Sequence, residues 1–153
     1  LAAERAGAAL VWNVDSSAAA LDFAAAHHAG AEGRQRFTAA DVFEWLPALA
    51  PDQPFDLVIA DPPPMTSRMS QLERALSAYR RLYAAIGRHV TPGGRVVACC
   101  CTSRVSERAF RHAVEAGLGP GFRFERRLPP ELDHPVGFPE ADYLKIALFA
   151  RSS

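Results

Sequence analysis

Residues 55–64 read FDLVIADPPP. The first part, Phe55 to Ala60, is a short apolar run of the kind that forms a buried strand. The prolines after Asp61 end that strand, because a proline has no backbone N–H to pair with a neighbouring strand. The stretch therefore predicts a buried strand with an aspartate at its carboxyl end.

Further strands and helices alternate on both sides of this stretch. The predicted strands are residues 8–14, 35–38, 55–60, 95–101, 122–128 and 143–150. The predicted helices run from a cap at Ser16 or Ser17 to about Gly30, over a short segment after Asp41, from Met69 to about Val90, and from a cap at Ser106 to Gly117. Thr91-Pro92-Gly93-Gly94 is a turn signal. This alternation predicts an α/β domain with a mostly parallel sheet.

Polar or reactive residues follow four of the predicted strands. They are Asp15, Asp41, Asp61 and Cys101. In α/β sheets of this kind, ligands bind outside the carboxyl ends of the strands. We therefore expect the functional site at this edge of the sheet.

The first two aspartates suit the recognition of a nucleoside. Asp15 can accept hydrogen bonds from both hydroxyls of a ribose, and the alternative is that it caps the following helix. Asp41 can accept a hydrogen bond from an adenine amino group, or it simply begins its own helix. Either residue taken alone leaves both readings open.

The Asp61-Pro62-Pro63 segment is more specific. Two prolines fix the backbone beyond the strand, so the aspartate and nearby carbonyls point in set directions. Such a rigid rim suits a planar base that has been flipped out of its stack, whereas a plain end to the strand would need only one proline.

Cys101 is the candidate nucleophile, because a cysteine at a strand end can be partly exposed with a stabilised thiolate. Side chains alternate along a strand, so Cys99 and Cys101 face one way and Cys100 the other. This arrangement, with no histidine nearby, cannot close a tetrahedral zinc site. Cys99 and Cys100 are best explained as small apolar residues of the core.

The composition agrees with a soluble globular domain. Of the 153 residues, 49% are apolar and 22% are charged, which excludes intrinsic disorder. No apolar run approaches the roughly 18 to 20 residues of a membrane span. Seventeen basic residues balance seventeen acidic ones, so no overall positive field indicates nucleic-acid binding. The contiguous cysteines exclude a disulfide framework, and no signal peptide is visible after Leu1, so a cytoplasmic location is expected.

Three longer motifs carry a family resemblance. FDLVIADPPP with a following SQL, TPGGRVVACCCTS, and DHPVGFPEADYLKIALFA together resemble the cytosine-5 methyltransferases of bacterial large-subunit ribosomal RNA. The resemblance runs from about Ala3 to Arg151. It implies a Rossmann-like, S-adenosylmethionine-dependent enzyme with helices on both faces of the sheet, and ribosomal RNA as its partner.

The resemblance also implies a role for each strand-end residue. Asp15 and the adjacent Ser16 match the part that holds the cofactor ribose, and Asp41 and Val42 match the part around the adenine. Cys101 matches the catalytic cysteine that adds to C6 of cytosine.

The segment after the third predicted strand matches the part of the family that binds the target base. Asp61, Pro62 and Pro63 match the target-base motif. The resemblance also implies that Asp61 contacts the cofactor. Met65 stands where the family usually has an aromatic residue. Cys100 and Thr102 flank Cys101 where the family usually has small hydroxyl residues. No metal is implied.

The resemblance places a glycine-rich cofactor loop and a first strand before Ala3, and a separate RNA-binding domain before those. We therefore expect residues 1–153 to be one partial catalytic domain, and a chain without the RNA-binding domain would show no basic surface.

Two other functions stay open. One is an amino-group methyltransferase, in which an aromatic residue directly follows the aspartate-diproline, a place that Pro64 occupies here. The other is an inactive fragment.

Overall fold

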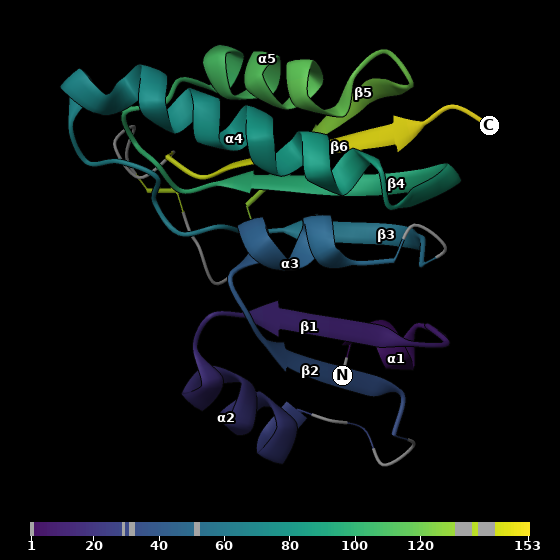
Figure 1. The fold of residues 1–153 in the computed structure, drawn as a ribbon. Helices are drawn as coiled ribbons and strands as arrows, with labels where there is room; N and C mark the ends of the chain where they lie inside the picture. Colours follow the sequence, from purple (N-terminus) through teal and green to yellow (C-terminus); the bar gives the residue numbers. More distant parts are fainter. Residues whose placement is uncertain (1, 29, 31–32, 51–52, 131–135, 138–142) are drawn as a thin grey trace. The chain divides into compact units, whose positions relative to one another are not determined.

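A computed structural model of the chain describes residues 2–28, 30, 33–50, 53–130, 136–137 and 143–153. The chain forms two compact units, Leu1–Leu49 and Ala50–Ser153. Figure 1 shows the helices and strands of each unit in chain order. No helix within the described ranges is long and apolar enough to cross a lipid bilayer.

The first unit is built on a pair of parallel strands. Its elements are α1 (Ala2–Arg5), β1 (Val11–Asp15), α2 (Ala18–His28), β2 (Gln35–Ala39) and α3 (Val42–Ala48). Trp12 on β1 donates a hydrogen bond from Nε1 to Thr38 Oγ1 on β2, at 2.7 Å. The same indole packs edge-on against Trp45 of α3, with ring centroids 5.0 Å apart. These contacts fix α3 against the strand pair.

The second unit is a four-stranded sheet with two long helices. Its elements are β3 (Phe55–Ala60), η1 (Met69–Gln71), α4 (Leu72–Gly87), β4 (Val90–Cys100), α5 (Glu107–Leu118), β5 (Phe122–Leu128) and β6 (Lys145–Arg151). The strand order is β3-β4-β6-β5. β3 and β4 are parallel, and β6 is antiparallel to both of its neighbours. Three strands of this sheet therefore run in one direction, as predicted, and β6 alone is reversed.

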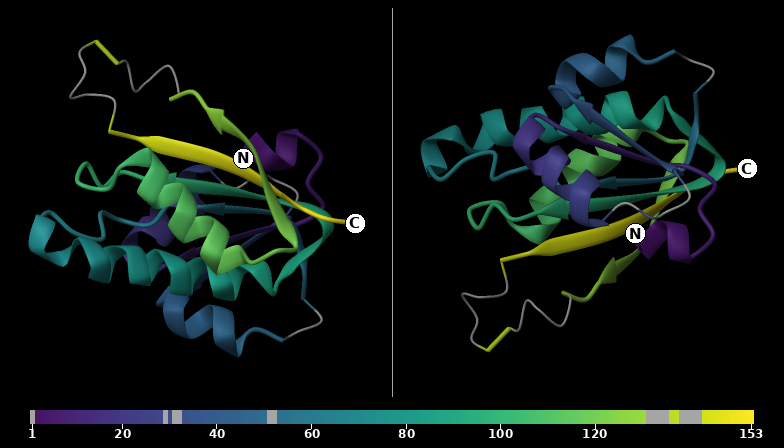
Figure 2. Two further views of the ribbon diagram at one scale, coloured as in Figure 1. Left: turned by 90° about the horizontal axis from the view of Figure 1, so that it is seen from above. Right: turned by 90° about the horizontal axis from the view of Figure 1, so that it is seen from below.

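α4 and α5 lie side by side on one face of this sheet (Figure 2). Tyr79 and Tyr83 of α4 are fully buried, and Phe110 of α5 packs edge-on against them, with centroid distances of 5.2 and 6.2 Å. The apolar spacing predicted from Met69 onward therefore forms the helical side of the core. The helix ends at Gly87, before Val90, which instead begins β4.

The segment Thr91-Pro92-Gly93-Gly94 is not a turn between elements, as predicted, but an irregular part of β4. Phe55 pairs with Val90 and Leu57 pairs with Arg95, so β4 has extra residues opposite β3. Gly93 has φ +76°, a conformation that glycine adopts without strain. The turn residues therefore bulge out of a continuous strand. The short helix predicted after Asp41 is α3, which includes Pro47 in its last turn.

Candidate active site

The carboxyl ends of β3 and β4 bring the aspartate-diproline segment and Cys101 together. The two strands are parallel and Ala60 pairs with Ala98, so the residues that follow each strand emerge at the same edge. The Cys101 thiol points at the backbone carbonyl oxygen of Pro62, with Sγ 3.8 Å from that oxygen. Asp61 is exposed and Pro62 is half-buried. This edge of the second unit is the candidate active site.

The surroundings of Cys101 favour the thiol over the thiolate. Its side chain is half-buried, and burial is the largest of the effects that raise its pKa. The neighbouring Cys100 and Asp61 raise the pKa further, whereas Lys145 lowers it. The partly exposed position is therefore as predicted, but these surroundings do not provide the predicted stabilised thiolate.

The other two cysteines belong to the core, as predicted. Cys99 and Cys100 are 8% and 0% exposed. Burial raises the pKa of Cys99 to about 11, so this thiol is uncharged at neutral pH. Cys100 accepts a hydrogen bond at its Sγ from the Tyr79 hydroxyl of α4, at 3.3 Å. It therefore faces the helices.

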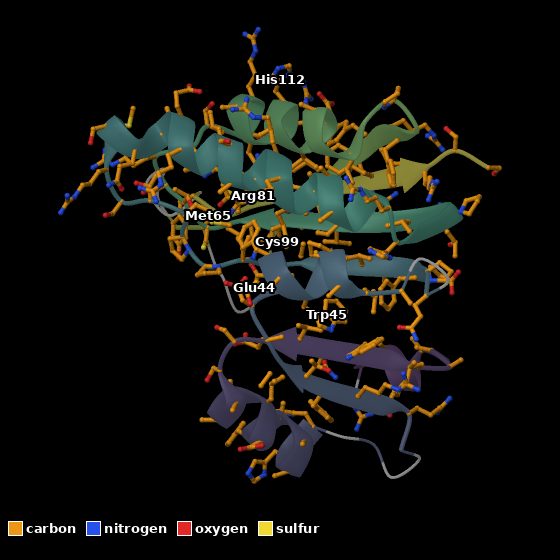
Figure 3. All side chains as sticks on the ribbon, in the orientation of Figure 1. Glu44, Trp45, Met65, Arg81, Cys99 and His112 are labelled. Carbon is orange, nitrogen blue, oxygen red and sulfur yellow. The ribbon has the colours of Figure 1, made fainter. Side chains whose placement is uncertain are left out.

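A chain of hydrogen bonds ties the loop after β3 to the loop after β4. The backbone N–H of Met65 donates to Thr102 Oγ1 at 3.1 Å, and that hydroxyl lies 3.1 Å from the Tyr79 hydroxyl. Met65 lies near the tip of the β4 arrow in Figure 3. Because Thr102 directly follows Cys101, these bonds hold the candidate nucleophile against the diproline loop.

Thr102, Tyr79 and Lys145 are residues whose part in this site the sequence did not predict. The sequence indicates Thr102 only as a neighbour of Cys101, and Tyr79 falls within the helix predicted from Met69. Lys145, in the YLK motif, donates from Nζ to the backbone oxygen of Thr102 at 2.8 Å. Its signal in the sequence is that it is the single lysine among seventeen basic residues.

Four of the five predicted cofactor residues, Asp15, Ser16, Asp41 and Val42, lie together in the first unit, and the fifth, Asp61, belongs to the second unit. Asp15 pairs with Ala39 at the carboxyl ends of β1 and β2, and the Ala40 N–H donates to the backbone oxygen of Asp15 at 2.9 Å. Asp41 follows directly. Both carboxylates are exposed, as is Ser16, and Val42 is half-buried. Exposed carboxylates of this kind fit the hydroxyl and amino groups of a nucleoside.

Both aspartates also make the local bonds of the alternative reading. Asp15 Oδ1 accepts a hydrogen bond from the Ser17 N–H at 2.7 Å. Asp41 Oδ1 accepts one from the Phe43 N–H at 2.8 Å and caps α3. Ser17, not Ser16, caps α2, through a 3.2 Å bond from the Ala20 N–H. A single carboxylate can hold its own loop with one oxygen and offer the other to a ligand.

Other predicted residues belong neither to the group around Cys101 nor to the group around Asp15 and Asp41. Pro63 is exposed beyond Pro62. His134, Pro135, Pro139 and Glu140 of the C-terminal motifs lie outside the described residues. Within the described ranges, no group of three or more His, Cys, Asp or Glu residues is placed to hold a metal ion.

A family match gives the class of protein to which this fold belongs. Residues 1–150 match the family described as S-adenosylmethionine-dependent methyltransferase. The chain belongs to this family, whose methyl donor is S-adenosylmethionine.

Two curated proteins of similar sequence are named as ribosomal RNA methyltransferases. The chain is 37% identical to a ribosomal RNA large subunit methyltransferase of Deinococcus radiodurans, over 95% of the chain and 37% of that protein. It is 34% identical to ribosomal RNA large subunit methyltransferase I of Shewanella amazonensis, over 95% of the chain and 39% of that protein. The chain thus spans less than two fifths of the length of these relatives.

Solved structures confirm the Rossmann-like methyltransferase fold. A Streptococcus mutans protein assigned as a SAM-dependent methyltransferase aligns with a TM-score of 0.77 at 20% identity, over 97% of the chain and 40% of that protein. NSun6 from Pyrococcus horikoshii, solved with SFG, aligns with a TM-score of 0.69 at 15% identity, over 94% of the chain and 42% of that protein.

Proposed function

We propose that this chain carries the catalytic residues of an enzyme that forms 5-methylcytosine in large-subunit ribosomal RNA, with Cys101 as the nucleophile. The observation that carries the proposal is the Cys101 thiol, held 3.8 Å from the Pro62 carbonyl oxygen at the strand edge that Asp61 shares. The relatives named as ribosomal RNA large subunit methyltransferases support the choice of RNA.

The proposed reaction starts at the sulfur. The Cys101 thiol loses its proton, and the thiolate adds to C6 of the cytosine, which makes C5 nucleophilic. When bound, S-adenosylmethionine would supply the methyl group from its sulfonium, and the sulfur would keep the electron pair of the broken S–CH3 bond as a neutral thioether. C5 takes that methyl group, and a base then removes the C5 proton, so the C5–C6 double bond re-forms as the Cys101 thiolate is expelled.

Asp61, Pro62, Pro63 and Met65 form the proposed base site. The diproline backbone is rigid, and the 3.1 Å bond from the Met65 N–H to Thr102 Oγ1 fixes the far end of the same loop. The exposed Asp61 carboxylate can accept a hydrogen bond from the cytosine amino group. This loop is suited to hold a flipped base over the sulfur.

We propose Asp15 and Ser16 for the cofactor ribose, and Asp41 and Val42 for its adenine. In support, both carboxylates are exposed at one edge of the β1–β2 pair. We also propose that residues 1–153 are part of one catalytic domain, since the family match runs across both units to residue 150.

The test is methyl transfer to large-subunit ribosomal RNA by the complete gene product, with the modified base identified by mass spectrometry. We expect 5-methylcytosine, and we expect Cys101→Ser to abolish it, because a hydroxyl is far less nucleophilic than a thiolate toward C6. RNA containing 5-fluorocytosine should trap wild-type enzyme covalently, since fluorine blocks loss of the C5 proton.

Cys99→Ala is the matched control, because it removes a neighbouring core thiol and leaves Cys101 in place. This variant should keep its activity and its covalent trapping. A fully active Cys101→Ser enzyme would refute the covalent mechanism. Methylation of an exocyclic amino nitrogen would instead favour an amino-group methyltransferase.

A further inference from the structure

Lys145 is the one lysine of the chain, and it is buried, with 6% of its surface exposed. Lysine is almost never found at such depth unless its ammonium group is held by partners, because burying a charge costs free energy. It lies at the start of β6, opposite Cys100 of β4. The burial of Lys145 beside β4 therefore suggests that this residue has a function.

The ammonium group holds the backbone directly after the candidate nucleophile. Lys145 Nζ donates to the backbone oxygen of Thr102 at 2.8 Å, and Cys100 Sγ points at the same oxygen from 4.0 Å. Thr102 itself is 1% exposed. Lys145 thus fixes the Thr102–Ser103 peptide from the side of β6, while Met65 and Tyr79 fix the Thr102 hydroxyl.

Lys145 also supplies positive charge near the Cys101 thiol, where burial is the largest effect that raises the pKa and a backbone hydrogen bond is the larger of two effects that lower it. Four titratable side chains, each from a different part of the fold, interact electrostatically with Cys101: Asp61 after β3, Tyr79 from α4, Cys100 from β4 and Lys145 from β6. Asp61 and Cys100 raise the pKa of Cys101, and Lys145 lowers it. Without this ammonium group, the thiolate would be still harder to form.

We propose that Lys145 is a positioning residue for Cys101: it anchors the Thr102 carbonyl, keeps the sulfur against the diproline loop, and favours the thiolate form. The inference rests on the proposed function in that it takes Cys101 as the nucleophile. A purely structural lysine would hold the loop without affecting the ionisation of the thiol, and this difference can be measured.

The experiment measures the rate at which iodoacetamide alkylates Cys101 between pH 6 and 10, with the label located by tandem mass spectrometry. Neither RNA nor S-adenosylmethionine is present, so the result is independent of methyl transfer. The variants are Lys145→Met, which removes charge and donor, Lys145→Gln, which keeps a donor, and Lys145→Arg, which keeps the charge. Arg104→Met is the control, because it removes an exposed cation from the loop after Cys101.

We expect the rate profile of Lys145→Met and Lys145→Gln to move to higher pH, with alkylation near neutral pH slowed at least about threefold, since only the thiolate reacts. Lys145→Arg should stay within about twofold of the wild type, because the guanidinium keeps its charge. Arg104→Met should match the wild type. Circular dichroism establishes that each variant is folded, and Lys145→Gln carries the test if Lys145→Met does not fold.

An unchanged pH profile in a folded neutral variant would overturn the inference, as would an equal slowing by Arg104→Met. Slowed alkylation together with an active Cys101→Ser enzyme would uphold the role of Lys145 and contradict the proposed function.

Discussion

Tyr79 and Tyr83 are both fully buried on α4, yet their hydroxyl groups have different surroundings. The Tyr79 hydroxyl donates to Cys100 Sγ and lies 3.1 Å from Thr102 Oγ1. The Tyr83 hydroxyl has no hydrogen-bond partner within the described part of the chain. Burial raises the pKa of both groups well above the usual value, so both stay protonated.

We expect Tyr79→Phe to lower the free energy of unfolding by about 1–2 kcal/mol, because it leaves the buried Thr102 hydroxyl without one partner. Tyr83→Phe is the matched variant and should be neutral or stabilising, since it removes a buried hydroxyl that makes no hydrogen bond to the described residues. Urea unfolding of the two variants checks this. Equal losses would show that the hydroxyl network contributes nothing specific.

At the level of elements, α4 and α5 are in close contact at Gly117. A methyl group there would lie 2.6 Å from the Arg80 carbonyl oxygen and 2.9 Å from Tyr83 Cβ. Both neighbours belong to the helix opposite, so relief would require the two helices to separate. The small residue therefore sets how closely the helical layer packs.

Gly117→Ala should destabilise the protein by about 1–3 kcal/mol through overpacking. The direction is informative, because alanine is otherwise favoured over glycine inside a helix by about 1 kcal/mol. Gly121→Ala is the control, since a methyl group there meets no atom within 4 Å. Thermal or urea unfolding measures both, and a stabilising Gly117→Ala would contradict the close packing.

For the whole molecule, the buried thiols predict a loss of stability in alkaline solution. Burial raises the pKa of Cys99 from 9.0 to about 11, and it also raises that of Cys101. Between these values the unfolded chain releases thiol protons that the folded chain keeps. The unfolded state therefore binds fewer protons, and the free energy of unfolding falls as pH rises.

We expect Cys99 to contribute a fall of roughly 2–3 kcal/mol between pH 9 and 11. Sixteen of the seventeen basic residues are arginine, which stays charged in this range, so lysine titration adds little, whereas the buried Tyr79 and Tyr83 add a fall of the same sign. Urea unfolding at several pH values gives the slope, and Cys99→Ala should make it shallower. The same slope in wild type and Cys99→Ala would exclude the thiol as its source.

The sequence by itself determined the elements and the residues at their ends. Apolar runs and helix caps depend on residues that are close along the chain. The strands at 55–60 and 122–128 and the helix cap at Ser106 therefore appear where they were predicted. The strand-end rule likewise placed Asp61 and Cys101 at one edge, because parallel strands share their carboxyl ends.

Only the tertiary structure decided what surrounds those residues. The turn residues 91–94 became part of β4 because pairing with β3 continues past them, which local propensity does not contain. The contacts of Thr102 with Met65, Tyr79 and Lys145 join residues far apart in the chain. The balance of burial and charge that raises the pKa of Cys101 depends on those distances, since desolvation and Coulomb energies are set by neighbours in space.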